Sequence, residues 1–114
     1  MSQTTIMPTL FYPSLADVAV FDSSGPRPQF LVDSEKLKVI VAGLEAGQRI
    51  PAHSEALAIY YFLDGSGVMT VNNEEFTVYA GSTVVAPPGA ARGIHATVPL
   101  TFLAVKSNVE EGAI

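Results

Sequence analysis

The sequence contains no cysteine, and His53 and His95 are the only histidines among its 114 residues. The absence of cysteine excludes disulfide bonds, thiolate nucleophiles and thiolate metal ligands. A bound metal ion would therefore depend on histidine and carboxylate side chains, and a mononuclear site normally takes at least three of them.

Basic residues are also few. Six Lys and Arg stand against eleven Asp and Glu, which gives a formal net charge of -5 at pH 7. The six are scattered along the chain, whereas proteins that bind phosphate backbones present a clustered basic face. This distribution argues against nucleic acid as a partner.

Long apolar runs are missing as well. No stretch approaches the roughly 20 apolar residues of a membrane span. Residues 1–13 include no basic residue and no apolar core of the length that a signal peptide needs. We therefore expect a cytoplasmic protein without a membrane partner. Hydrophobic residues still make up 48% of the chain and charged residues 15%, which predicts a folded domain that buries surface against a partner.

Short runs rich in Val, Ile, Tyr, Phe and Thr fill the chain from Lys36 onward, separated by Gly, Pro, Asn and Asp. This pattern is typical of β-strands and turns, and no run shows a helical stripe over a dozen residues. The predicted strands are 36–44, 48–53, 57–63, 67–71, 75–80, 83–86, 92–96 and 100–106, with two more near 16–21 and 29–32. They predict one domain over residues 1–114, with its core at about 36–106 and N-terminal strands and an arm at 1–35.

Turn residues support an all-β fold. The pair Asn72-Asn73 suits a two-residue hairpin, because Asn tolerates positive φ. Gly81 and the run Pro87-Pro88-Gly89 separate later strands, and residues 110–114 have the composition of a solvated tail. Many short antiparallel strands predict a sandwich or a closed barrel, because an open sheet of that size would leave two unpaired edges.

These turn residues resemble the two-part sequence signature of the cupin superfamily. Gly47 and His53 keep the spacing of the first motif, and Gly81, Pro87 and Gly89 keep the spacing of the second. The resemblance covers about residues 36–106 and is to small single-domain cupins of the type 2, RmlC-like kind. It implies a double-stranded β-helix, the jelly-roll barrel of that family.

The metal-ligand positions of the signature are mostly altered. Where the family has its second histidine this chain has Glu55, and Ala58 stands at the position of the family's glutamate. Arg92 takes the position of the third histidine and Ala96 that of the asparagine. Only His53 remains from the ligand set that the resemblance implies, so we expect no metal cofactor.

A metal site made by His53, Glu55 and His95 stays open as an alternative. His53 and Glu55 are two residues apart, so on one strand they would share a face. His95 would face outward in a regular strand if Arg92 faces inward, although a bulge would reverse this. An inward Arg92 also opposes a metal ion, since a unit charge about 4 Å away costs on the order of 4 kcal/mol per unit of metal charge at an effective dielectric near 20.

Arg92 itself has two possible roles. It can pair with the Glu55 carboxylate across the barrel, an arrangement that would satisfy both charges in a dry interior. Alternatively, part of its donor fork stays free and binds a carboxylate or another anion of a small ligand.

The run that begins at Ala58 predicts what lines the interior. If Ala58 faces inward, alternation brings Tyr60 and Phe62 inward and turns Ile59 and Tyr61 outward. An apolar interior with a few convergent polar groups is the usual composition of a small-molecule pocket, and it also fits plain core packing. The predicted ligand-binding residues are His53, Glu55, Tyr60, Phe62 and Arg92.

Four functions fit these features, and we favour the first. It is a metal-free domain that binds a small anionic molecule through Arg92 and His53. The second is an isomerase, epimerase or lyase with His53 as base and Tyr60 or Glu55 as proton partner, because histidine titrates near neutral pH. The third is a metal-dependent oxygenase or isomerase, and the fourth is an interaction module with a filled interior.

Runs that are apolar on both faces, such as residues 39–41 and 59–63, predict a second covered surface. An exposed apolar sheet of this size is unusual on a monomer. Because cupin-like domains commonly pair through such a sheet, the resemblance adds to our expectation of a homodimer.

Overall fold

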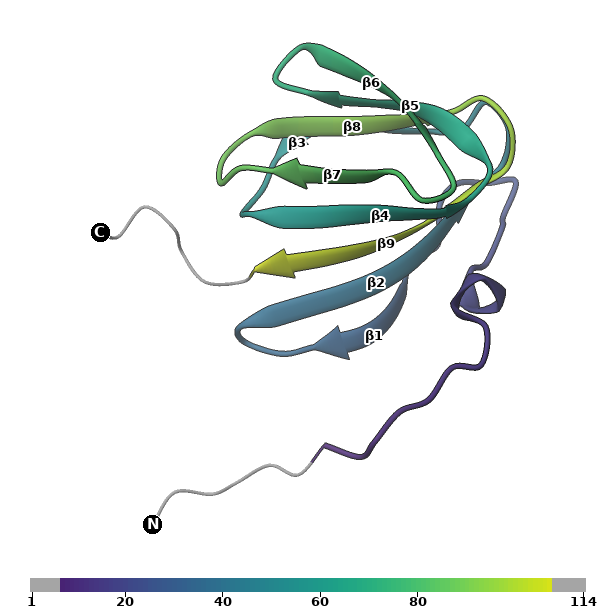
Figure 1. The fold of residues 1–114 in the computed structure, drawn as a ribbon, viewed down its shortest axis with the longest axis vertical. Coiled ribbons are helices and arrows are strands. Elements are labelled where there is room, and N and C mark those ends of the chain that lie inside the picture. Colours follow the sequence, from purple (N-terminus) through teal and green to yellow (C-terminus); the bar gives the residue numbers. More distant parts are fainter. Residues whose placement is uncertain (1–6, 108–114) are drawn as a thin grey trace.

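The computed structural model describes residues 7–107, which form nine β-strands and one short 3₁₀ helix. The strands make two antiparallel sheets that enclose the interior (Figure 1). The five-stranded sheet has the order β1-β2-β9-β4-β7, and the four-stranded sheet has the order β3-β8-β5-β6. The bounds are β1 (Gln29–Asp33), β2 (Leu37–Leu44), β3 (Arg49–Ser54), β4 (Ala58–Asp64), β5 (Ser66–Val71), β6 (Glu74–Tyr79), β7 (Thr83–Ala86), β8 (Ala91–Ala96) and β9 (Leu100–Ser107).

The chain crosses repeatedly between the two sheets. β2 and β4 lie in the five-stranded sheet on either side of β9, whereas β3 and β5 lie in the four-stranded sheet on either side of β8. Strands far apart in the sequence therefore become neighbours, as in other jelly rolls. This is a double-stranded β-helix, and the predicted fold class is confirmed.

The core lies between the two sheets. On β4 the burial alternates, so that Tyr60 and Phe62 point inward while Ile59 and Tyr61 point outward, as the sequence predicts. Phe102 on β9 packs against both inward rings, with centroid distances of 5.9 Å to Tyr60 and 5.8 Å to Phe62. Burying one such aromatic side chain contributes roughly 1.5–3 kcal/mol, so this cluster is a main source of stability.

β3 carries a bulge that decides which of its side chains face the interior. Ile50 pairs with Ile94 and His53 pairs with Arg92, so three steps along β3 match two steps along β8. The extra residue turns His53 to the same side as Ile50. Pro51 lies within this bulge on an edge strand, where a residue without an N–H breaks no ladder.

The hairpin between β5 and β6 has the predicted turn. Asn72 and Asn73 both have positive φ, at 48° and 71°, which a two-residue hairpin of this kind requires. Seven of the predicted strands, from 36–44 through 92–96, begin and end within one residue of the observed bounds, and 100–106 extends by one residue to Ser107. The predicted tail at 110–114 lies outside the described residues.

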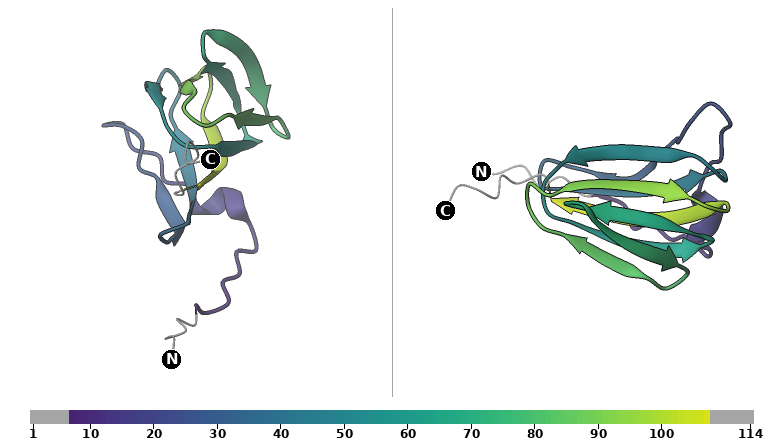
Figure 2. Two further views of the ribbon diagram at one scale, coloured as in Figure 1. Left: turned by 90° about the vertical axis from the view of Figure 1, so that its left-hand side faces the viewer. Right: turned by 90° about the horizontal axis from the view of Figure 1, so that it is seen from above.

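The predicted strand at residues 16–21 is wrong. The structure has a 3₁₀ helix, η1 (Leu15–Val18), followed by extended chain that joins no sheet. The ring of Phe21 lies over Gly43 of β2, so this segment crosses the face of the sheet, where its backbone has no ladder to join. Before η1, residues 7–14 run away from the barrel as an arm (Figures 1 and 2).

No helix in residues 7–107 is long and apolar enough to cross a membrane. The cytoplasmic location stays a prediction.

Candidate functional site

A cavity of about 310 Å³ opens between the two sheets, on the side of β2, β3, β8 and β9. It lies where the bulged edge strand β3 leaves the interior accessible, and the segment before β1 borders it. Its lining residues are Pro26, Pro28, Ile40, Ala42, Arg49, Ile50, Pro51, His53, Tyr60, Arg92, Gly93, Ile94, Phe102 and Lys106. The lining is mainly apolar with a few polar groups, as in small-molecule sites.

The charged residues of this lining are all basic. Arg49, Arg92 and Lys106 are three of the six Lys and Arg in the whole sequence, and His53 is a fourth group able to carry positive charge. Within residues 7–107 no Asp or Glu lines the cavity, although acidic residues outnumber basic ones in the chain. The lining therefore carries basic groups only, although the Glu55 carboxylate beside it contacts His53 and Lys106.

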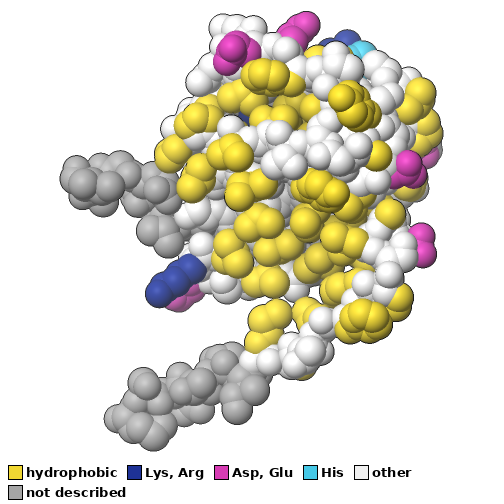
Figure 3. Space-filling view, viewed as in Figure 1, with side chains coloured by type: hydrophobic (Ala, Val, Ile, Leu, Met, Phe, Trp, Pro, Cys, Tyr) yellow, Lys and Arg dark blue, Asp and Glu magenta, His cyan; other side chains and the backbone are white. Residues whose placement is uncertain are grey.

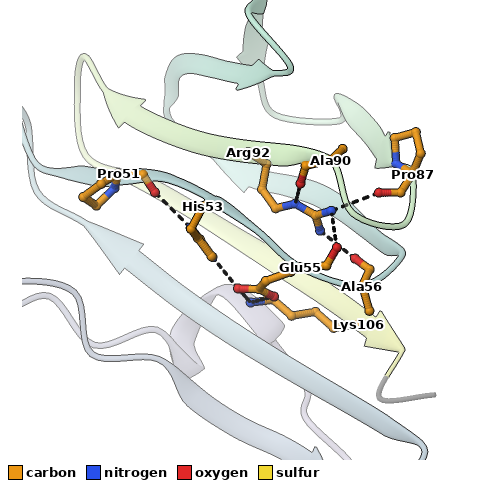
Figure 4. Close-up of polar contacts among 8 residues, drawn as sticks. All are labelled: Pro51, His53, Glu55, Ala56, Pro87, Ala90, Arg92 and Lys106. Carbon is orange, nitrogen blue, oxygen red and sulfur yellow. Dashed lines mark hydrogen bonds and ion pairs between the residues drawn. The ribbon is translucent and has the colours of Figure 1, made fainter. Parts of the chain in front are cut away.

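Arg92 lies within the interior, only 1% exposed, and is held by backbone carbonyls (Figure 4). Its Nε donates to the Ala90 oxygen at 2.9 Å and its Nη1 to the Ala56 oxygen at 2.8 Å. Its Nη2 donates to the oxygens of Glu55 and Pro87, at 3.0 and 3.1 Å. The guanidinium thereby joins the loop between β3 and β4 to the loop between β7 and β8.

The predicted ion pair between Arg92 and the Glu55 carboxylate is wrong. Arg92 contacts the main chain of Glu55, and the Glu55 side chain turns the other way (Figure 4). Carbonyl dipoles satisfy the buried guanidinium, so its positive charge has no carboxylate beside it within the described chain. The prediction failed because it counted side-chain partners and left out the backbone acceptors of the two loops.

His53 lies at the mouth of the cavity with both ring nitrogens engaged. Its Nδ1 lies 2.9 Å from the Pro51 oxygen, and its Nε2 contacts the Glu55 carboxylate. Both neighbours are acceptors, so a ring protonated on both nitrogens satisfies both contacts. In this arrangement neither nitrogen is free to take a proton from a ligand, which weighs against His53 as a general base.

The Glu55 carboxylate bridges His53 and Lys106. The Lys106 Nζ lies 3.0 Å from one Glu55 oxygen and 3.3 Å from the other. Partial burial raises the pKa of the Glu55 carboxyl, but hydrogen bonds from Lys106 and His53 outweigh this effect and hold the pKa below its usual value. Glu55 is therefore a carboxylate at neutral pH.

Tyr60 lines the cavity floor, whereas Phe62 does not line it. Burial raises the pKa of the Tyr60 hydroxyl, and the neighbouring Arg92 offsets only part of that rise. Tyr60 is therefore a neutral phenol that can donate a hydrogen bond. Phe62 is fully buried against Phe102, deeper in the core.

His95 lies on the other face of β8 from Arg92 and Ile94 and is paired across strands with Arg49 and Val68. The structure does not bring it together with His53 and Glu55. Among residues 7–107, no three His, Cys, Asp or Glu side chains gather where a metal ion could bind. These residues do not fit the mononuclear metal site of the fold family, because only His53 and Glu55 meet and Arg92 adds a buried positive charge near them.

Sequence reasoning missed Lys106 and Arg49 as parts of the site. Lys106 shares the inward face of β9 with Phe102 and Ala104, so the alternation of that strand contained the signal. Arg49 is paired with His95, on the outward face of β8, so the alternation of β3 alone would place it outside the cavity that it helps to line.

Comparison with known proteins agrees with this architecture. The family model described as "Cupin domain" matches residues 39–106. An uncharacterized protein of Methanocaldococcus jannaschii, MJ1618, is 42% identical over 53 residues, which make up 45% of this chain and 42% of that protein. The matched part thus spans less than half the length of this relative.

Two solved structures resemble the chain over most of its length. The conserved SPY1581 protein of unknown function from Streptococcus pyogenes is 25% identical with a TM-score of 0.81, covering 97% of this chain and 98% of its own. TT1209 from Thermus thermophilus is 25% identical with a TM-score of 0.77, covering 84% and 95%. Since the family model covers more than half of the 114 residues, the chain belongs to the cupin domain family.

Proposed function

We propose that this chain binds a small anionic molecule with an apolar body, in the cavity between its two sheets and without a metal ion. The observation that carries this proposal is the sign of the charge in the lining. Half of the Lys and Arg residues of an acidic chain line one cavity, and no Asp or Glu of the described residues belongs to its wall. Charges in a partly buried site are screened less than charges in bulk water, so they favour an anion there.

Lys106 is the main candidate for direct contact with the anion. Its ammonium has three donors and is engaged with Glu55 alone among the described residues. The Tyr60 hydroxyl adds a neutral donor on the cavity floor, and Arg49 adds a cation at the rim. Arg92 acts differently from our first expectation, since carbonyls take four of its five N–H donors and it contributes mainly through its buried charge.

The apolar residues of the cavity wall favour a ligand whose remaining part is apolar. Ile40, Ile50, Ile94 and Phe102 come from both sheets and face one another across the cavity. The volume of about 310 Å³ equals that of about ten water molecules at roughly 30 Å³ each. A compact carboxylic acid with one ring or a short branched chain fits this space.

We also propose that the chain forms a homodimer through an outer face made of Ile59, Tyr61, Thr83, Val85, Leu103 and Val105. These residues are cross-strand neighbours on β4, β7 and β9, and none is charged. Val85 is 58% exposed, and hydrophobic side chains gather over this side of the molecule (Figure 3). The arm at residues 7–14 is also uncharged, and its Phe11 is 80% exposed, so both surfaces suit a second copy of the chain.

Titration with sodium benzoate, followed by ¹⁵N NMR, tests the binding proposal. We expect shift changes to cluster at Ile50, Tyr60 and Ile94, and Lys106→Met to weaken binding about tenfold. Lys36→Met removes the same charge from an exposed site outside the lining and should change affinity less than twofold. Absence of shifts at the cavity, or an equal loss in both variants, would contradict the proposal.

A further inference from the structure

The Glu55 carboxylate lies between two basic side chains that line the cavity, His53 and Lys106. One of its oxygens contacts the His53 Nε2, and Lys106 lies 3.0 and 3.3 Å from its two oxygens (Figure 4). His53 and Lys106 belong to the cavity wall, whereas Glu55 reaches them from the loop beside it. These two basic side chains are thus already arranged around one planar carboxylate, and that carboxylate belongs to the protein.

The side chain of Glu55 can leave this position without disturbing the loop. Its backbone carbonyl accepts hydrogen bonds from Arg92 at 3.0 Å and from the Gly89 N–H at 2.8 Å, so the main chain is fixed. Its carboxylate has only the two contacts with His53 and Lys106 among the described residues, and the side chain is 28% exposed. Ion pairs with this access to water contribute little to stability, so rotation of the side chain toward solvent is inexpensive.

We propose that Glu55 occupies, in the free protein, the subsite that takes the carboxylate group of the ligand. The inference rests on the proposed function and names its ligand class: a monocarboxylate whose apolar body lies against Ile50, Ile94 and Phe102. On binding, the ligand carboxylate replaces that of Glu55 between His53 and Lys106, and Glu55 turns outward. The apolar wall favours such an acid over inorganic phosphate, which has no apolar part.

An internal carboxylate that holds the subsite competes with the ligand. Its removal therefore strengthens binding, whereas removal of a residue that contacts or orients a ligand weakens binding. Glu55→Gln keeps the shape of the side chain and removes its charge. Glu55→Ala removes the side chain but keeps the backbone contacts with Arg92 and Gly89, so it serves as a second variant if the amide still binds Lys106.

Benzoate titrations of four proteins test this inference: the unmodified chain, Glu55→Gln, Glu55→Ala and Glu75→Gln. Glu75 is exposed on β6 and lies outside the cavity wall, so its variant matches the change in net charge. We expect both Glu55 variants to bind benzoate about three- to fivefold more tightly, in line with the small contribution of ion pairs that are partly exposed to water, and Glu75→Gln to change affinity less than twofold. In the unmodified chain, benzoate should also shift the ¹³Cδ resonance of Glu55 as this carboxylate leaves its partners.

The outcomes separate the two proposals. If benzoate binds the unmodified chain but the Glu55 variants bind it equally or more weakly, the placeholder role is wrong and the proposed function stands. If none of the four proteins binds benzoate or a longer apolar monocarboxylate at the cavity, the proposed function fails and this inference fails with it. If phosphate competes with benzoate at equal concentration, the subsite takes anions in general and the assignment to monocarboxylates is wrong.

Discussion

Arg92 reaches Glu55 through the backbone carbonyl, at 3.0 Å, and leaves the Glu55 carboxylate to Lys106. Arg92 and Lys106 therefore bind different parts of Glu55. Arg92 holds the main chain of the loop between β3 and β4, and Lys106 holds the side chain at the cavity mouth. This division makes Arg92 a structural residue and leaves Lys106 and Glu55 as the polar groups that can rearrange.

Replacement of Arg92 should therefore destabilise the fold. Arg92→Met leaves the Ala90 and Ala56 oxygens without the donor that they have now, and each buried carbonyl without a partner costs about 1–3 kcal/mol. We expect a loss of roughly 2–4 kcal/mol in the free energy of unfolding, measured by urea denaturation. Arg92→Lys should not restore it, because one ammonium cannot span four carbonyls.

Arg27→Met is the control for Arg92. Arg27 is exposed and pairs with Asp22 at the surface, so its loss should lower the free energy of unfolding much less than the loss of Arg92. An Arg92→Met protein as stable as the Arg27→Met protein would contradict the structural role.

Gly93 should be sensitive to a single added methyl group. A Cβ there would lie 2.8 Å from the Ile50 oxygen and 3.0 Å from the Ala52 nitrogen, which are backbone atoms of the β3 bulge. Gly93→Ala should cost about 1–3 kcal/mol, because the bulge must shift as a whole. A crystal structure or NMR shifts of His53 should show that ring displaced.

Gly43→Ala provides the comparison. The added Cβ would meet the far end of the Phe21 ring, at 2.9 Å, and that ring can move outward. This variant should lose less stability than Gly93→Ala in the same denaturation assay. A larger loss for Gly43→Ala than for Gly93→Ala would contradict the prediction that the backbone of the bulge yields less than the Phe21 ring.

The stability of the fold should depend slightly on the charge of Glu55, because its ion pairs are partly exposed to water. Because the pKa of this carboxyl is held below its usual value, the carboxylate stabilises the native state above the usual Glu range near pH 4.5. That contribution is lost as the pH falls through the lowered pKa. Between pH 7 and pH 3 the unmodified chain should therefore lose more stability than Glu55→Gln, as measured by urea denaturation at each pH. Parallel pH profiles would show that the contacts with Lys106 and His53 do not persist in solution.

The proposed homodimer involves two surfaces, the arm at residues 7–14 and the outer face, and each can be tested with its own variant. Phe11→Asp places a charge on the arm at residues 7–14, and Tyr61→Asp places one on the outer face defined above. Each variant alone should be monomeric by size-exclusion chromatography with light scattering, because a buried charge without a partner is costly. If the arm of one copy covers the face of the other, mixing the two variants should restore a heterodimer with one intact contact. A Phe11→Asp protein that stays dimeric would limit the interface to the face.

Sequence patterns predicted the features of this fold that depend on neighbouring residues alone, such as side-chain alternation and turn conformation. The alternation on β4 placed Tyr60 and Phe62 inside, and Asn72 and Asn73 marked a turn that needs positive φ. By contrast, the composition of residues 16–21 favours a strand, but pairing depends on a free sheet edge, and Phe21 instead lies on the face of β2.

The site was harder to predict for two reasons. Arg92 is bound by backbone atoms, and the direction of His53 depends on a register shift between β3 and β8. The carbonyls that bind Arg92 carry no signature in the sequence, since every residue has one. The bulge in β3 depends on the pairing with β8, and it sets where His53 points. The alternation on β9 does place Lys106 on the same face as Phe102, but Lys106 lies outside the positions of the family motif.

The preference of the cavity for an anion is tested most directly with a matched acid and amide. Benzoate and benzamide have nearly the same shape and differ in charge, so their dissociation constants for the unmodified chain isolate the effect of Lys106 and its neighbours. We predict at least tenfold tighter binding of benzoate, equivalent to about 1.4 kcal/mol, and a loss of this difference in Lys106→Met. Equal affinities in the unmodified chain, or tighter binding of benzamide, would contradict the proposed preference.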